Sequence, residues 1–158
     1  MPPELHDDRI TAFGLFTEVH AGLVARLSAH LAEHGLSLVE FGVMVRLGRS
    51  PDQRLRMTEL ASQVALTTSG ITRVVDRLER EGMVHRQACP DDRRGLWAVL
   101  TPAACTRLAA ALPGHLALLQ REFTGRFRPD ELEVLVTRLR QIRDEVNPTA
   151  APALTAWS

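Results

Sequence analysis

Hydroxyl and guanidinium side chains gather on one face of a predicted helix near the middle of the chain. The helix, residues 68–81, has an apolar stripe at helical spacing that should face a core, formed by Ile71, Val74, Val75 and Leu78. Its other face carries Thr68, Ser69, Thr72, Arg73 and Arg77. Such groups hydrogen-bond to phosphates and base edges, so the helix suits the major groove of DNA. The alternative is a solvated face whose hydroxyls only cap the helix, with Arg77 paired to Asp76 or to an acid of the next segment.

Two further arginines stand in a predicted turn directly after this helix. Gly82 suits the position that ends the helix, and residues 83–89 and 96–101 have the composition of strands. The six residues between them, 90–95, are polar and turn-forming, which predicts a β-hairpin with Arg93 and Arg94 at its tip. Such a wing can place guanidinium groups in a minor groove, where the potential is negative. Asp92 is spaced to hold Arg94 by a charge-assisted bond, and a solvated turn arginine is the alternative.

A third candidate chemistry is metal binding. His30, Glu33 and His34 match the H-x-x-E-H pattern of some zinc enzymes and put both histidines on one helical face. A metal-dependent hydrolase or a metal sensor is therefore an alternative function. The pattern stops at Gly35, a helix end, and histidines that complement the helix dipole are the simpler interpretation. We expect no catalytic residue, metal or cofactor.

The two cysteines, Cys89 and Cys105, are candidates for a thiol redox switch, because one adjoins the predicted wing tip and the other lies in the first turn of a helix. The hairpin should carry them to opposite ends, which argues against a bridge between them. No signal peptide and no uninterrupted apolar run near 18 residues is present, so we expect a cytoplasmic protein with reduced thiols and no membrane partner.

Caps and breakers predict the elements that position these groups. A first helix spans about residues 8–34, and Ser37 with Glu40 forms a capping box that opens a second. Residues 54–57 alternate as a short strand, and residues 58–64 give the first helix of a helix-turn-helix.

Two more helices should follow the wing. Thr101-Pro102 starts one of them, and Pro113-Gly114 should kink it. Its predicted buried face comprises Leu108, Leu112, His115, Leu116, Leu119 and Phe123. Arg128-Pro129 starts the last helix, whose apolar face includes Leu139. The first and last helices are strongly apolar on one side, which favours packing against a second copy; packing on each other within one chain is the alternative.

Two segments resemble known signatures. Residues 72–84, TRVVDRLEREGMV, resemble the recognition-helix signature of the MarR (multiple antibiotic resistance regulator) family. Residues 91–95, DDRRG, followed by Leu100-Thr101, are similar to that family's wing signature at the expected separation. The resemblance covers about residues 8–146, with one departure at Ala104, where the family usually has glycine.

The resemblance implies a homodimer joined through its N- and C-terminal helices. It also implies a small-molecule pocket between those helices and the DNA-binding unit, for which the candidates are Phe16, His20, Met44 and His115. A histidine satisfied in the core is the plainer reading for His20 and His115.

Charge is uneven along the chain although the formal net charge is +0. Residues 1–45 carry two arginines against six acids, whereas residues 46–100 carry ten arginines against seven acids. The small basic excess therefore falls on the segment expected to touch DNA. There is no lysine, so anion contacts should be planar and bidentate.

Together these observations predict a mostly α protein with a small β wing. A single domain should cover residues 1–146, with dimerisation helices at about 8–34 and 102–146, a winged helix-turn-helix at about 37–101, and a flexible tail at 147–158. The expected function is that of a homodimeric regulator that binds a pseudo-palindromic DNA operator. It would be a repressor relieved by a small-molecule effector, and not an enzyme.

Overall fold

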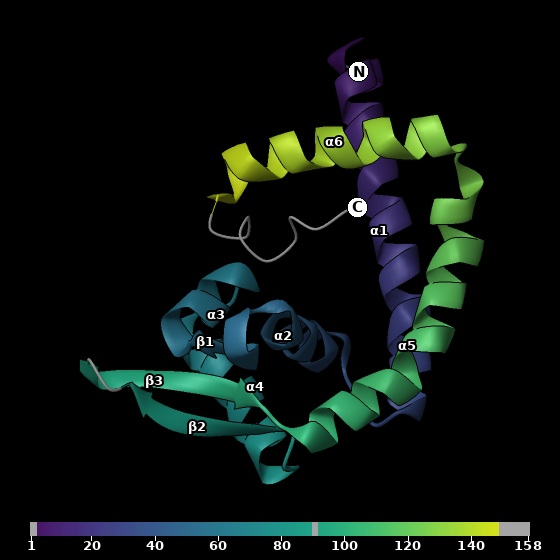
Figure 1. Ribbon diagram of the computed structural model, residues 1–158. Helices are drawn as coiled ribbons and strands as arrows, with labels where there is room; N and C mark the ends of the chain where they lie inside the picture. The colour runs from purple at the N-terminus through teal and green to yellow at the C-terminus, as the bar shows by residue number, and fades with distance from the viewer. Residues whose placement is uncertain (1–2, 90–91, 149–158) are drawn as a thin grey trace.

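The computed structural model describes residues 3–89 and 92–148, and the side chains of residues 5–89 and 95–148. Within these ranges the fold is mostly helical with one small sheet, as the sequence predicted (Figure 1). The elements in chain order are α1 (Asp8–Glu33), α2 (Leu38–Arg49), β1 (Arg54–Arg56), α3 (Met57–Gln63), α4 (Thr68–Arg80), β2 (Val84–Cys89), β3 (Asp92–Leu100), α5 (Pro102–Glu122) and α6 (Pro129–Val146). Short 3-10 turns are Pro3–His6, Pro51–Gln53 and Thr124–Arg126.

The predicted caps set the helix boundaries. Ser37 Oγ accepts from the Glu40 amide at 3.2 Å, and the Glu40 carboxylate accepts from the Ser37 amide at 2.8 Å, which completes the capping box. Thr67 Oγ1 accepts from the Gly70 amide at 3.1 Å and opens α4. Gly82 ends that helix with φ 71°, a backbone conformation that favours glycine.

The sheet has the order β1-β3-β2 with antiparallel pairs, so the third strand expected at residues 54–57 is confirmed. The predicted six-residue tip is wrong, because β3 already begins at Asp92, which pairs with Cys89. Polar side chains did not prevent this pairing, since the ladder uses backbone groups and a register shift at Ala88/Cys89 absorbs the mismatch. Residues 90–91 lie outside the described residues, as do the side chains of Asp92, Arg93 and Arg94.

The core lies between the helices of the helix-turn-helix, α2 and the sheet. Its fully buried side chains include Met44, Leu47, Leu60, Ile71, Val75, Leu78 and Val84. The apolar stripe predicted for α4 contributes to this cluster, together with apolar residues of α2 and α3. The cluster therefore fixes α4 against the sheet, and its polar face turns outward.

α1 and α5 lie side by side and lead away from this compact unit, and α6 stands apart from it (Figure 1). α5 changes direction part-way along, where Pro113 sits inside the helix. The bend brings α5 close to α1: a Cβ on Gly114 would lie only 2.5 Å from Cε1 of His30. A larger residue at position 114 would therefore require the His30 ring to move.

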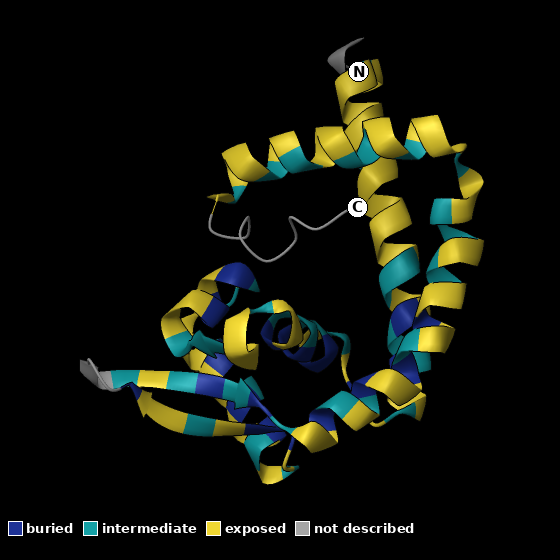
Figure 2. Cartoon of the chain, viewed as in Figure 1, coloured by how far each residue is buried: buried dark blue, intermediate teal, exposed yellow. Residues whose placement is uncertain are grey.

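Large apolar side chains remain uncovered on α1 and α6 (Figure 2). None of the 18 residues of α6 is buried, so the two helices do not cover each other within one chain. Leu116 is 58% exposed, which corrects its predicted place on the buried face of α5. By length and composition α1 could cross a membrane, but Glu18 and Arg26 interrupt its apolar surface, and Leu27 and Leu31 near its end are buried in the protein.

Candidate nucleic-acid interface

The polar face of α4 is exposed along its first three turns. Thr68, Ser69, Thr72 and Arg73 all face solvent. Thr72 Oγ1 donates to the carbonyl oxygen of Thr68 at 2.8 Å, which fixes one hydroxyl with its lone pairs outward. Among the described residues no hydrogen bond or ion pair engages the Arg73 guanidinium. The face is thus free to meet another molecule, and its contact with DNA stays a prediction.

Arg77 is held by acids of its own chain. Its Nε lies 2.9 Å from Oε1 of Glu40 and 3.1 Å from Oε1 of Glu81. The hydrogen bond to Glu81, together with the charges of both acids, raises the pKa of Arg77. Glu40 is only 3% exposed, so Arg77 neutralises a buried carboxylate. Among the described residues Arg77 therefore pairs with Glu40 and Glu81 and not with Asp76, one of the alternative partners considered from the sequence. The side chains of the wing acids lie outside the described residues, and a DNA contact by Arg77 stays a prediction.

Arg86 joins the wing to α4. From β2, its Nη2 donates to Asp76 Oδ1 at 2.6 Å, and its Nη1 donates to Glu79. The backbone amide of Arg86 also donates to Glu79 Oε1, at 2.9 Å. Burial alone would lower the pKa of Arg86, but the hydrogen bonds to Asp76 and Glu79 raise it overall. Arg86 was not among the residues predicted from the sequence, although strand alternation places it on the same face as buried Val84.

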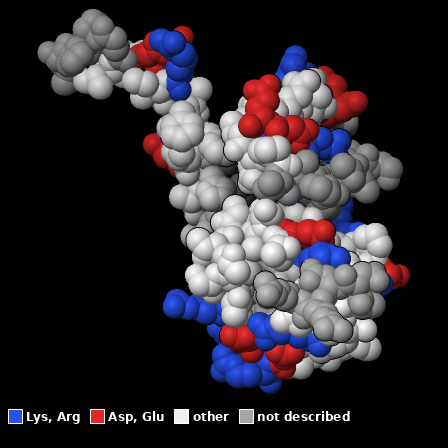
Figure 3. Space-filling model, turned by 90° about the vertical axis from the view of Figure 1, so that its left-hand side faces the viewer, with Lys and Arg blue, Asp and Glu red and all other residues white. Residues whose placement is uncertain are grey.

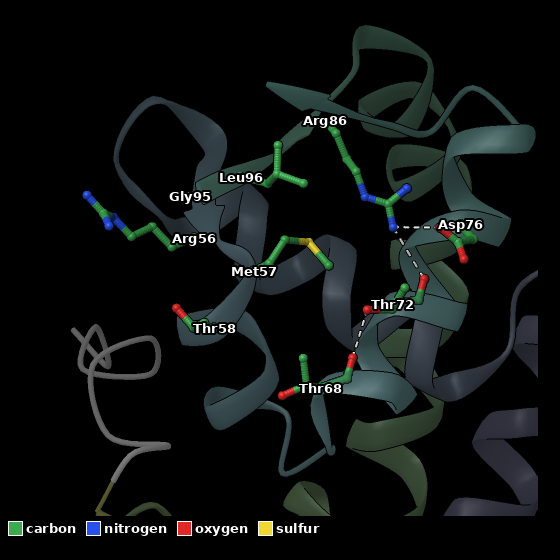
Figure 4. Close-up of a pocket in the computed structure, with 9 residues that line it drawn as sticks. All are labelled: Arg56, Met57, Thr58, Thr68, Thr72, Asp76, Arg86, Gly95 and Leu96. Carbon is green, nitrogen blue, oxygen red and sulfur yellow. Dashed lines mark hydrogen bonds and ion pairs between the residues drawn. The ribbon is translucent and has the colours of Figure 1, made fainter. Parts of the chain in front are cut away.

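A groove of about 440 Å³ lies between α4, the start of α3 and the wing (Figure 4). Its lining is Arg56, Met57, Thr58, Thr68, Thr72, Asp76, Arg86, Gly95 and Leu96. Hydroxyls lie along one side of the groove, and Met57 and Leu96 give apolar surface. The side chains of Arg56 and Arg86 lie on opposite sides. This mixture of donors and apolar contacts matches a sugar–phosphate strand, which presents anionic oxygens and apolar sugar faces.

The four candidates for a small-molecule pocket do not come together. Phe16 and His20 contact each other, with ring centroids 6.4 Å apart, on the exposed half of α1. Met44 is fully buried in the core, and His115 is buried against Phe41 at 4.4 Å. Burial, and then the charge of His30, lower the pKa of His115. The reading of His20 as a core histidine was wrong, whereas His115 is buried with an Nδ1 that has no hydrogen-bond partner among the described residues.

His30 and His34 lie on one helical face, as predicted, with ring centroids 5.0 Å apart. His30 Nε2 lies 3.1 Å from the carbonyl oxygen of Ala111, so this nitrogen carries a hydrogen and donates to α5. In the described part of the chain, no group of three histidine, cysteine or acidic side chains is arranged to hold a metal ion. His30 instead packs α1 on α5, through Ala111 and His115.

Both cysteines are free thiols. Cys89 is buried at the end of β2, and Cys105 is half-buried near the start of α5. A redox role for either thiol stays a prediction.

Comparison with known proteins identifies the arrangement. A family model described as MarR family matches residues 36–96. The HTH-type transcriptional repressor YetL of Bacillus subtilis is 34% identical over 129 residues, covering 78% of this chain and 77% of YetL. The chain belongs to the MarR family. MarR-family proteins are DNA-binding transcriptional regulators and not enzymes, which agrees with the prediction from sequence.

Two solved MarR structures from Streptomyces coelicolor resemble the whole molecule. Sco3205, solved in complex with DNA, superposes with a TM-score of 0.85 at 31% identity and covers 97% of this chain and 96% of its own. AbsC superposes with a TM-score of 0.84 at 30% identity and covers 90% of this chain and 96% of its own. The likeness therefore extends beyond the winged helix to the helices at both ends.

Proposed function

We propose that this MarR-family chain is a homodimeric repressor that binds a specific DNA operator and is released by a small molecule. The observation that carries the DNA-binding part is the exposed hydroxyl and arginine face of α4, held beside a wing by Arg86. YetL is described as a repressor and Sco3205 was solved with DNA, which supports the same reading. A DNA partner in turn supports a cytoplasmic location.

The uncovered apolar surface of α1 and α6 supports the dimer. Exposed fractions reach 68% at Phe13 on α1 and 76% at Val146 on α6, values that are high for large apolar side chains. Figure 3 shows the end of α1 projecting from the rest of the molecule, with charged atoms near its tip and mostly uncharged described atoms below. A second copy covers such a surface by two-fold symmetry, because the same patch is present on both partners.

The effector response is supported by the surroundings of His115. Its ring packs on Phe41, and its Nδ1 is a buried polar atom without a partner among the described residues. A polar group of a small molecule that reached this nitrogen would give it a hydrogen-bond partner. Because α5 runs from this point to the wing through Thr101, such a ligand can shift the DNA-binding unit.

The experiment that tests the proposal is genome-wide footprinting, followed by binding to the recovered site. A two-fold dimer requires a pseudo-palindrome with half-sites about 10–10.5 bp apart, one helical turn. Direct repeats, or one chain per site by light scattering, would contradict the dimer. An absence of any protected site would contradict the DNA-binding role. Genes beside the site then guide the choice of effector, which should lower affinity for the operator.

A further inference from the structure

Two arginines on the edge strand of the sheet share one tryptophan. In the register of β1 and β3, Arg54 pairs with Val99 and Arg56 pairs with Trp97. Residues two apart on a strand share a face, so both arginines stand on the side of Trp97. Their Cζ atoms lie 5.0 Å and 5.5 Å from the centroid of the Trp97 ring. The tryptophan therefore orients two guanidinium groups at once.

This arrangement prepares an arginine to bind an anion. The aromatic face attracts a guanidinium through its quadrupole, yet it carries no net charge and leaves the positive charge of the arginine in place. Stacking also uses the plane of the guanidinium, whereas the N–H groups around its edge remain directed sideways. Because the long side chain is already restrained, less conformational entropy is lost when it binds.

The two arginines differ in their position relative to the candidate DNA interface. Arg56 borders the groove between α4 and the wing, near Thr58, and Figure 4 shows its guanidinium pointing outward on the side opposite Arg86. Arg54 is not part of that lining, and its Nη2 lies 3.0 Å from Asp52 Oδ2. The pair thus contains both a candidate and a matched control on the same ring.

The geometry of a duplex shows what would occupy this groove. Major and minor grooves are separated by one sugar–phosphate strand, so a protein with a helix in one and a wing in the other has that strand between them. We propose that Arg56, oriented by Trp97, binds a phosphate of the strand that crosses this groove. The inference rests on the proposed DNA-binding function and adds a contact from an element outside the recognition helix and the wing tip.

The test is fluorescence anisotropy of the full chain on operator and scrambled duplexes over a salt series. Each phosphate contact contributes about 0.9 to the salt slope and about fivefold to the affinity at 0.15 M salt. The proposed dimer would lose two such contacts, so its salt slope should fall by about 1.8 and its affinity by about 30-fold, on both duplexes. We expect this for Arg56→Ala and Arg56→Gln. Arg54→Ala should bind like wild type, and Arg56→Lys should keep the salt slope with a smaller loss of affinity.

Several outcomes separate the possibilities. The cap of α3 uses the backbone amide of Arg56, which donates to Glu59 at 3.3 Å and is kept in every variant. Arg56→Ala and Arg56→Gln also remove the contact with Trp97, so a small decrease in melting temperature is expected, and circular dichroism should show each variant folded at the temperature of the binding measurement. If wild type binds and the Arg56 variants match it at every salt concentration, the inference alone is overturned. An equal loss in Arg54→Ala also overturns it. If wild type binds no duplex, the proposed function is overturned as well.

Discussion

Asp76 of the recognition helix accepts a hydrogen bond of 2.6 Å from Arg86 of the wing. The same guanidinium bonds Glu79 one turn further along α4, so two carboxylates of one helix fix one strand. Charge-assisted bonds of this kind are among the stronger ones in proteins. The direction of the wing relative to α4 is therefore set by side chains that need not touch DNA themselves.

The first prediction concerns this link. Arg86→Ala should weaken operator binding because the wing loses its fixed direction, and it should make the loss caused by Arg94→Ala much smaller than in wild type. The coupling between the two substitutions, measured by a double-mutant cycle on operator affinity, is expected to be about 0.5–3 kcal/mol. Gln87→Ala is the control, because Gln87 is exposed on the other face of β2. Strictly additive effects would mean that Arg86 does not position the wing.

The second prediction separates base reading from groove reading. Arg73→Ala should weaken binding to the operator more than to scrambled duplex and relax preference at one symmetric pair of positions. A guanidinium on a guanine edge is worth roughly 1–3 kcal/mol of discrimination. Arg94→Ala should instead weaken both duplexes alike and reduce the salt slope by about one unit per protomer, or about two for the proposed dimer. Asp92→Ala should partly copy that loss if Asp92 holds Arg94. Wild-type binding by Arg94→Ala at every salt concentration would exclude the wing from the interface.

The third prediction concerns the exposed apolar face. Leu139→Asp should dissociate the proposed dimer, since a carboxylate buried without a partner costs on the order of several kcal/mol. Light scattering measures the mass, and circular dichroism checks that the chain is folded. Thr137→Asp adds the same charge at an exposed position on the other side of α6 and should leave the dimer intact. A stable, DNA-binding dimer of Leu139→Asp would place the interface elsewhere.

The fourth prediction concerns pH. Burial and the charge of His30 lower the pKa of His115 below its usual value of 6.5. Between those two pKa values the unfolded chain binds more protons than the folded one, so stability falls as pH drops below about 6.5 and levels off below the folded pKa. His115→Gln should flatten the melting temperature over this window. His85→Gln, at an exposed histidine, should not. An unchanged pH dependence in His115→Gln would remove His115 as its source.

Local signals predicted most of the fold. Ser37 with Glu40, Thr67, Gly82 and Thr101-Pro102 each use a side chain or backbone angle to end or begin a helix within a few residues, so their effect is visible in sequence. The start of β3 was not predicted, because pairing of Asp92 with Cys89 depends on a register shift that no single residue announces. The exposed face of α4 could be predicted because the apolar stripe on the opposite face of the same helix is visible in the local sequence.

Contacts between distant residues were beyond the sequence. Arg86 lies ten residues from Asp76 on a different element. The alternation of side chains along β2 indicates which face Arg86 is on, but not which residue it contacts. His30 meets Ala111 across 81 positions, and the pairing of Arg56 with Trp97 requires knowledge of the strand order. The polar residues at these positions look like ordinary solvated ones until the chain is folded.

The bend of α5 at Pro113 separates the bases that each α4 would read from the spacing between the two copies of α4 in the proposed dimer. Past the bend, α5 leads to the surfaces proposed to join two copies, and before it, α5 is anchored to the wing through Thr101. The length of this helix would therefore set the distance between the two recognition helices of the proposed dimer. One residue inserted after the bend would rotate everything beyond it by about 100°. Operator spacing would then change while the bases read by each α4 stay the same.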